Sequence, residues 1–102
     1  MRIDVVGRNV PVTDAIRQYA EGKAGKLTKY FENAVQSISL TVSKVNAAHH
    51  GDFDVELIID VEHHDDFISH AKAADVYAAI DIVVEKGERQ LRDYKELKSK
   101  KH

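Results

Sequence analysis

The chain has 102 residues, of which 43% are hydrophobic and 31% are charged, and its formal net charge is −2. These values predict a single domain spanning residues 1–102 and exclude a disordered chain, and the absence of cysteine excludes disulfides, thiolate metal sites and cysteine nucleophiles. No apolar run approaches the ~20 residues of a membrane span, and the N-terminus lacks the apolar core of an export signal, so we expect a cytoplasmic protein that contacts no membrane.

The first elements predicted along the chain are a strand and a helix. Residues 2–6 favour a short strand, which the turn at residues 7–9 closes. Thr13 is the expected N-cap of a helix over residues 14–32, because the apolar residues of that segment fall on one arc at 100° per residue.

Two glycines, Gly22 and Gly25, interrupt this predicted helix. They indicate either local slack or a close approach to a neighbouring backbone, and the sequence does not choose between the two. Residues 35–45 then alternate between apolar and polar side chains, which predicts a second, half-buried strand. Because its last valine is out of phase, we expect a β-bulge near residues 43–44.

The second half of the chain predicts two more strands and a long helix. Residues 53–61 place apolar side chains at odd positions and mostly acids at even positions, which indicates a strand with one apolar and one acidic face. Residues 67–73 favour a fourth strand. Asp75 is the expected N-cap of a final helix, which gives way to a flexible tail over about residues 98–102.

The order of these elements, β-α-β-β-β-α, predicts an α+β fold. We expect a four-stranded mixed sheet, in which the first helix makes a right-handed crossover between two parallel strands. Both helices would pack on the apolar face of this sheet, and the acidic face would stay open.

The charges are segregated along the chain. Residues 47–66 contain seven acids and no lysine or arginine, whereas residues 86–102 contain seven bases and three acids. A chain with a negative net charge can therefore still present a basic face to a phosphate backbone. The alternative is that these charges only solvate the surface. Lys23, in the apolar arc of the first helix, is expected to extend its ammonium into a groove between the helices.

Six histidines raise the question of a metal site. Adjacent histidines in an extended chain point to opposite sides, so neither pair, 49–50 or 63–64, is a natural chelate. A weak surface site of His63 or His64 with Asp65 or Asp66 stays open as an alternative. The sequence has no phosphate-binding loop and no nucleophile motif, so we expect no functional metal, no cofactor, no small-molecule substrate and no enzymatic activity.

Four segments together resemble the ribosome hibernation promoting factor family, which includes the ribosome-associated translation inhibitor and is also known as the sigma-54 modulation family. They are the opening GRNV-P-VTDAIR at residues 7–17, the K-x-x-K-L-x-x-Y-F pattern at 23–31, D-x-Y-x-A-I-D at 75–81, and K-x-x-R-Q-L at 86–91. The similarity covers essentially the whole chain, with near-constant spacing. Among its departures, Asp93 stands where the family often has lysine, and Gly87 replaces a larger residue.

The resemblance implies a β-α-β-β-β-α fold with two parallel helices on one side of the sheet. It also implies a protein that binds the small ribosomal subunit and its 16S-type rRNA in the channel used by mRNA and by A- and P-site tRNAs. Such a protein blocks translation and preserves inactive ribosomes under stress or in stationary phase. This chain is similar to the short form, and we expect a monomer when it is free. The residues that match the rRNA-binding positions of the family, or lie beside them, are Lys23, Lys26, Lys29, Lys86, Arg89, Arg92 and Lys95.

Two other functions are alternatives at this stage. The fold is also compatible with a general module that binds structured RNA. The acidic sheet face and the histidines are compatible with a metal-responsive protein-interaction module.

Overall fold

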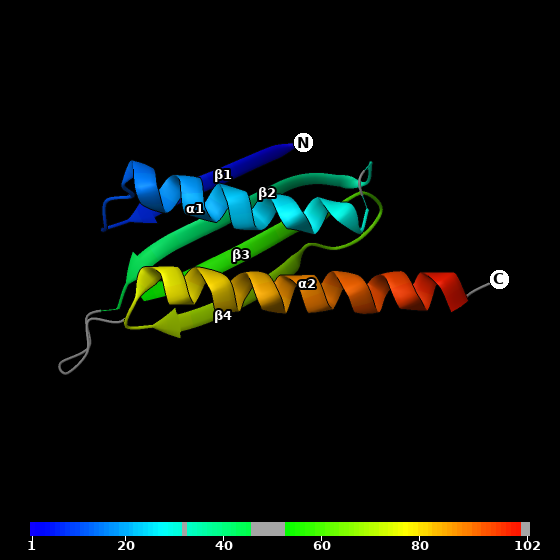
Figure 1. Ribbon diagram of the computed structural model, residues 1–102. Coiled ribbons are helices and arrows are strands. Elements are labelled where there is room, and N and C mark those ends of the chain that lie inside the picture. Colours follow the sequence, from blue (N-terminus) through cyan, green and yellow to red (C-terminus); the bar gives the residue numbers. More distant parts are fainter. Residues whose placement is uncertain (32, 46–52, 101–102) are drawn as a thin grey trace.

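The computed structural model describes residues 1–31, 33–45 and 53–100. Its elements follow the predicted order β-α-β-β-β-α, with a short 3₁₀ helix after the first α-helix (Figure 1). The elements are β1 (Arg2–Arg8), α1 (Asp14–Gly25), η1 (Lys26–Lys29), β2 (Val35–Lys44), β3 (Phe53–Val61), β4 (Phe67–Ala73) and α2 (Val76–Lys100).

The four strands form one mixed sheet in the order β1-β2-β3-β4. β1 runs parallel to β2, and the other two pairs are antiparallel. Figure 1 shows α1 and α2 lying side by side and parallel on the same face of this sheet. The predicted α+β class, the mixed sheet and the helices on one face are therefore confirmed.

The alternation of β3 decides which face of the sheet the helices cover. Val55, Leu57 and Ile59 are fully buried, whereas the residues between them are only partly covered. On α2, Ile80 and Leu91 are fully buried in the same core. Burying a side chain of this size contributes about 1.5–3 kcal/mol, so this face is stable only beneath the helices.

Side-chain caps fix the start of each helix as predicted. The Thr13 hydroxyl accepts a hydrogen bond from the backbone N–H of Ile16 at 3.2 Å. The Asp75 carboxylate accepts one from the backbone N–H of Tyr77 at 3.0 Å. Each bond satisfies an N–H that has no partner within its helix.

The first strand and the first helix end at different residues than predicted. β1 continues to Arg8 because its parallel pairing with β2 extends that far, and the turn follows at Asn9, where φ is 61°. The helix predicted over residues 14–32 ends at Gly25 and tightens into η1. The Thr28 hydroxyl donates a hydrogen bond to the backbone carbonyl of Gly25 at 2.9 Å. A side chain therefore satisfies a carbonyl that a continuing α-helix would pair with a backbone N–H.

Two further predictions of local structure were wrong. The register shift of β2 lies at its beginning, between Val35 and Ser37, whereas residues 43–44 pair regularly with β3. The tail predicted from about residue 98 is helical as far as Lys100, because α2 continues in the same helix beyond the sheet. Residues 101–102 lie outside the described residues.

Two described glycines occupy positions where a Cβ would not fit: Gly7, where it would overlap the backbone carbonyl of Val10, and Gly87 on α2. A Cβ at Gly22 or Gly25 would meet nothing within 4 Å, so close approach does not explain either of them. A Cβ at Gly87 would lie 2.5 Å from Cδ2 of Leu57 and 3.1 Å from Cδ1 of Ile59. Gly87 therefore allows α2 to lie directly against β3.

Candidate nucleic-acid interface

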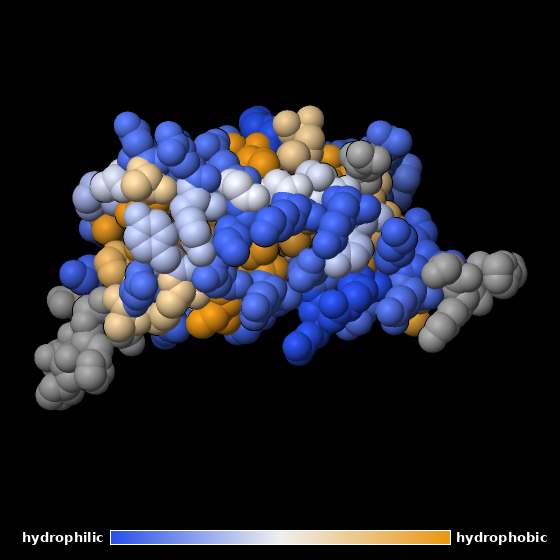
Figure 2. Space-filling view, in the orientation of Figure 1, coloured by the Kyte–Doolittle hydropathy of each residue, from blue (hydrophilic) through white to orange (hydrophobic). Residues whose placement is uncertain are grey.

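A groove runs between the two parallel helices on the helical face of the molecule. It encloses about 370 Å³, and buried Leu27 and Val84 contribute to its lining. In Figure 2, hydrophilic side chains cover most of this face, and apolar atoms show between them. One wall, from α1 and η1, contributes lysines, and the other, from α2, contributes carboxylates: Lys23, Lys26 and Lys29 face Asp81, Glu85 and Glu88.

The lysine wall contains Lys23, which lies at the groove as predicted, together with Lys26 and Lys29. Lys23 extends past the core, and 35% of its side chain stays exposed at the groove. Lys26 and Lys29 lie on η1, where the tighter 3₁₀ winding of three residues per turn brings side chains three apart onto the same side. Lys26 and Lys29 are therefore more closely aligned than in an α-helix, where residues three apart are rotated by about 60°.

A tyrosine, a carboxylate and a lysine meet at one end of the groove. The Tyr19 hydroxyl donates to Oδ1 of Asp81 at 2.6 Å, and Nζ of Lys23 lies 3.7 Å from the same oxygen. The ammonium also lies 5.5 Å from the centre of the Tyr19 ring, within range of a cation–π interaction. The hydrogen bond to Asp81 raises the pKa of the Tyr19 hydroxyl above its ordinary value, because the carboxylate favours the protonated phenol.

The same arrangement occurs again further along the groove. The Tyr30 hydroxyl donates to Oε2 of Glu88 at 3.1 Å, and Nζ of Lys29 lies 3.4 Å from that oxygen. The Lys29 ammonium lies 5.2 Å from the centre of the Tyr30 ring. We call these two clusters, Tyr19–Asp81–Lys23 and Tyr30–Glu88–Lys29, the groove triads. Both join α1 or the segment that follows it to α2.

The groove is therefore balanced in charge rather than purely cationic. The three lysines of one wall face three carboxylates of the other. The charges counted over residues 86–102 do not include Asp81 and Glu85, and this acidic wall was not predicted. The signal was present in the spacing of Asp81, Glu85 and Glu88, since residues at i, i+4 and i+7 share one face of a helix.

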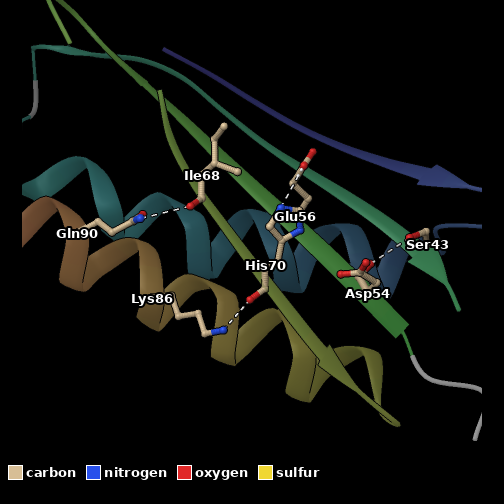
Figure 3. A network of polar contacts seen from close by, with 7 residues as sticks. All are labelled: Ser43, Asp54, Glu56, Ile68, His70, Lys86 and Gln90. Atoms are coloured by element: carbon tan, nitrogen blue, oxygen red, sulfur yellow. Dashed lines mark hydrogen bonds and ion pairs between the residues drawn. The ribbon is translucent and has the colours of Figure 1, made fainter. Parts of the chain in front are cut away.

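The basic residues of α2 do not form one surface. Nζ of Lys86 donates to the backbone carbonyl of His70 on the edge strand β4 at 2.7 Å (Figure 3), so this lysine points away from the groove. Arg92 and Lys95 follow Glu88 by one and two helical turns, so helical geometry puts them on the same side of α2 as Glu88, although neither lines the groove. Arg89 is exposed. The structure thus separates Lys86 from the lysine wall.

The open face of the sheet is less acidic than the alternation of β3 predicted. The strand register places Arg8, Ser43, Asp54 and Lys72 in one row across the four strands, so basic residues on both edge strands flank the acid of β3. Apolar residues interrupt the acids as well, and Val6 and Ile68 are each 50% exposed.

The described histidines have protein partners. Nε2 of His70 lies 3.5 Å from Oε2 of Glu56 on the open face (Figure 3). The His64 ring stacks on Phe67, with 4.3 Å between ring centres. Over residues 1–31, 33–45 and 53–100, no group of three or more histidine, aspartate or glutamate side chains could hold a metal ion. His49, His50 and His102 lie outside the described residues.

No helix that the structure describes is both long enough and apolar enough to span a membrane.

The chain is similar in sequence to proteins of one family over most of its length. Residues 3–99 match the model of the family described as sigma 54 modulation protein / S30EA ribosomal protein. The ribosome hibernation promotion factor of Lactococcus lactis is 37% identical over 95 residues, which are 93% of this chain and 50% of that protein. That of Staphylococcus aureus is 34% identical over 93% of this chain and 48% of that protein. The chain thus spans about half the length of these curated relatives.

Solved structures share its fold. The N-terminal domain of Protein Y from Thermus thermophilus superposes with a TM-score of 0.79 at 29% identity, over 92% of this chain and 99% of that one. A ribosomal subunit interface protein from Coxiella burnetii has a TM-score of 0.81 at 21% identity, over 94% and 99% of the two chains. The second likeness, at that identity, concerns the fold alone.

Proposed function

Because this chain belongs to the sigma 54 modulation protein / S30EA ribosomal protein family, we propose that it is a non-enzymatic ribosome hibernation factor. Acting as a single ribosome-binding domain, it binds the small ribosomal subunit in the channel used by mRNA and by A- and P-site tRNAs. Its presence there blocks translation and preserves inactive ribosomes under stress or in stationary phase. The names of the relatives from Lactococcus lactis and Staphylococcus aureus support ribosome hibernation as its role.

The observation that carries this proposal is the helical face, where three lysines line one wall of the groove between two parallel helices. Lysine and arginine neutralise phosphates and release counterions, which supplies much of the affinity of a protein for nucleic acid. Folded RNA is recognised largely by its shape and backbone, which a rigid surface can match. The rRNA contacts we propose are Lys23, Lys26, Lys29, Arg89, Arg92 and Lys95, with Lys86 at the margin of this surface.

The position of the carboxylates on the sheet fixes the orientation in which the chain docks. Asp54, Glu56 and Asp60 all lie on β3, on the face opposite to the helices. RNA repels these groups, so in the complex the open face points away from the rRNA.

Sedimentation of the purified chain with purified small subunits over a range of salt concentrations tests the proposal. We expect the chain to co-sediment at 50 mM salt, with an affinity that falls on the order of 100-fold by 200 mM if roughly four phosphates are contacted. Added mRNA and tRNA should compete for the site. A general RNA-binding module would instead bind an arbitrary RNA duplex equally well, and that result would contradict the proposed site.

A further inference from the structure

The groove triads share a feature that helix packing alone does not require. In the first, the Tyr19 hydroxyl and the Lys23 ammonium both approach Oδ1 of Asp81. In the second, the Tyr30 hydroxyl and the Lys29 ammonium both approach Oε2 of Glu88. A hydrogen bond and an ion pair at the same oxygen hold the orientation of each carboxylate and leave its second oxygen to accept from another molecule.

Both carboxylate side chains are accessible from the groove. The side chains of Asp81 and Glu88 are 44% and 33% exposed, and both line the groove. Glu88 follows Asp81 by seven positions, which is roughly 10.5 Å along α2. The groove therefore presents two oriented hydrogen-bond acceptors along its length, each beside a lysine that its own triad partly neutralises.

We propose that Asp81 and Glu88 determine specificity in this groove by accepting hydrogen bonds from RNA donors and by repelling phosphates. The inference rests on the proposed function and names the chemistry that the groove selects. A carboxylate accepts a hydrogen bond from a ribose 2′-hydroxyl or from the N–H groups of a base, and it never accepts one from a phosphate diester. A backbone that enters the groove with phosphates alone meets two fixed negative charges, which is the repulsive element that specific binding uses.

This division of roles explains why the groove carries carboxylates as well as lysines. Phosphate contacts are assigned to cations outside the triads: Lys26 on η1 and the arginines of α2. The groove itself is assigned to the sugar or base edges of an RNA segment that lies along it. Arbitrary duplex RNA is bound less well because its phosphates, which face outward, approach the groove first.

The test replaces both carboxylates by their amides, Asp81→Asn and Glu88→Gln. The tyrosine and the lysine still contact the oxygen that the amide keeps. The other oxygen is replaced by an NH₂ group, which donates hydrogen bonds and therefore favours phosphate. We expect the double variant to bind an arbitrary RNA duplex about fivefold more tightly and small subunits about fivefold less tightly than the wild type. Circular dichroism checks its helical content, and Glu88→Gln alone serves if the double variant does not fold.

Glu85→Gln is the matched control. It changes the same charge in the same groove but lies outside both triads. We expect it to strengthen duplex binding and to leave the affinity for small subunits unchanged. If the double variant gains duplex affinity as two changes of this kind would predict and loses no affinity for small subunits, the inference is overturned while the proposed function stands. A wild-type chain that does not co-sediment with small subunits overturns both.

A structured RNA hairpin and its 2′-O-methyl form distinguish the two possible hydrogen-bond donors, the ribose 2′-hydroxyl and the base N–H groups. Methylation removes the ribose donor and leaves the bases intact. If the wild type loses affinity for the methylated hairpin and the double variant does not, Asp81 and Glu88 accept from the ribose. If the two proteins differ equally on both hairpins, the donors are base N–H groups. Identical affinities of the two proteins for both hairpins would contradict any role for the carboxylates in RNA recognition.

Discussion

The two walls of the groove lie on neighbouring parallel helical segments and face each other with opposite charges. The wall of α1 and η1 presents three lysines, and the wall of α2 presents three carboxylates. Yet the segment from residue 86 onward, most of which lies on α2, carries a formal charge of +4. A helix distributes its residues around its axis, so the net charge of a segment does not give the sign of the face that it turns to a neighbour.

Charge reversal of the lysine wall gives the largest expected effect. We expect Lys26→Glu with Lys29→Glu to lower the affinity for small subunits on the order of 100-fold, because a cation that contacts phosphate and the cation that partly neutralises Glu88 are both replaced by negative charges. The matched change on the other helix, Lys86→Glu, should have an effect of less than about fivefold, since Lys86 points to the edge of β4. Sedimentation at fixed salt measures both. An equal loss for Lys86→Glu would show that the basic residues of α2 act as one surface after all.

Replacing one glycine of each helix by alanine extends the comparison of α1 and α2 to the free energy of unfolding. We expect Gly87→Ala to lower the free energy of unfolding by about 1 kcal/mol or more, because its Cβ would clash with the buried side chain of Leu57. We expect Gly22→Ala to raise it by about 0.5–1 kcal/mol, since alanine favours the helix and nothing lies near its Cβ. Urea unfolding followed by circular dichroism measures both. Changes of the same sign would mean that α2 is free to move away from the sheet.

The smallest expected effect concerns the bond between Tyr19 and Asp81. The pKa of Tyr19 is raised in the folded chain, so this contribution to stability is present below the ordinary tyrosine pKa of about 10 and is lost as the pH rises through the raised value. We therefore expect the difference in stability between the wild type and Tyr19→Phe to be constant from neutral pH to about pH 9 and to shrink above pH 10. Urea unfolding across this range measures it. A difference that does not depend on pH would contradict a hydrogen bond to Asp81.

Much of the fold could be predicted because local patterns and tertiary packing agree. The alternation of β3, the fourth strand, and the caps at Thr13 and Asp75 all appear in the structure as expected. The boundaries differ where tertiary pairing overrides the local signal. β1 extends to Arg8 because β2 pairs with it, and the bulge of β2 lies at its opposite end from the one expected.

The candidate site was predicted only in part. Lys23, Lys26 and Lys29 are brought together at the groove, but Lys86 is separated from them, and Asp81 and Glu88 were not anticipated. A position on a helix can be calculated from the sequence, whereas the neighbour that it faces depends on how the helix is rotated against the sheet. Gly87 contributes to that rotation because it lets α2 lie against Leu57. The spacing of residues along the sequence does not reveal such a contact.

The sequence by itself determined the order of the elements, the apolar face of the sheet and the membership of a family, because periodicity and short motifs are properties of neighbouring residues. Only the tertiary structure decided that two tyrosines of one wall bind two carboxylates of the other, across 62 and 58 positions of chain. Such pairs form when two helices are held parallel on one sheet, and their charges then act on each other at a few ångströms, regardless of their distance along the chain.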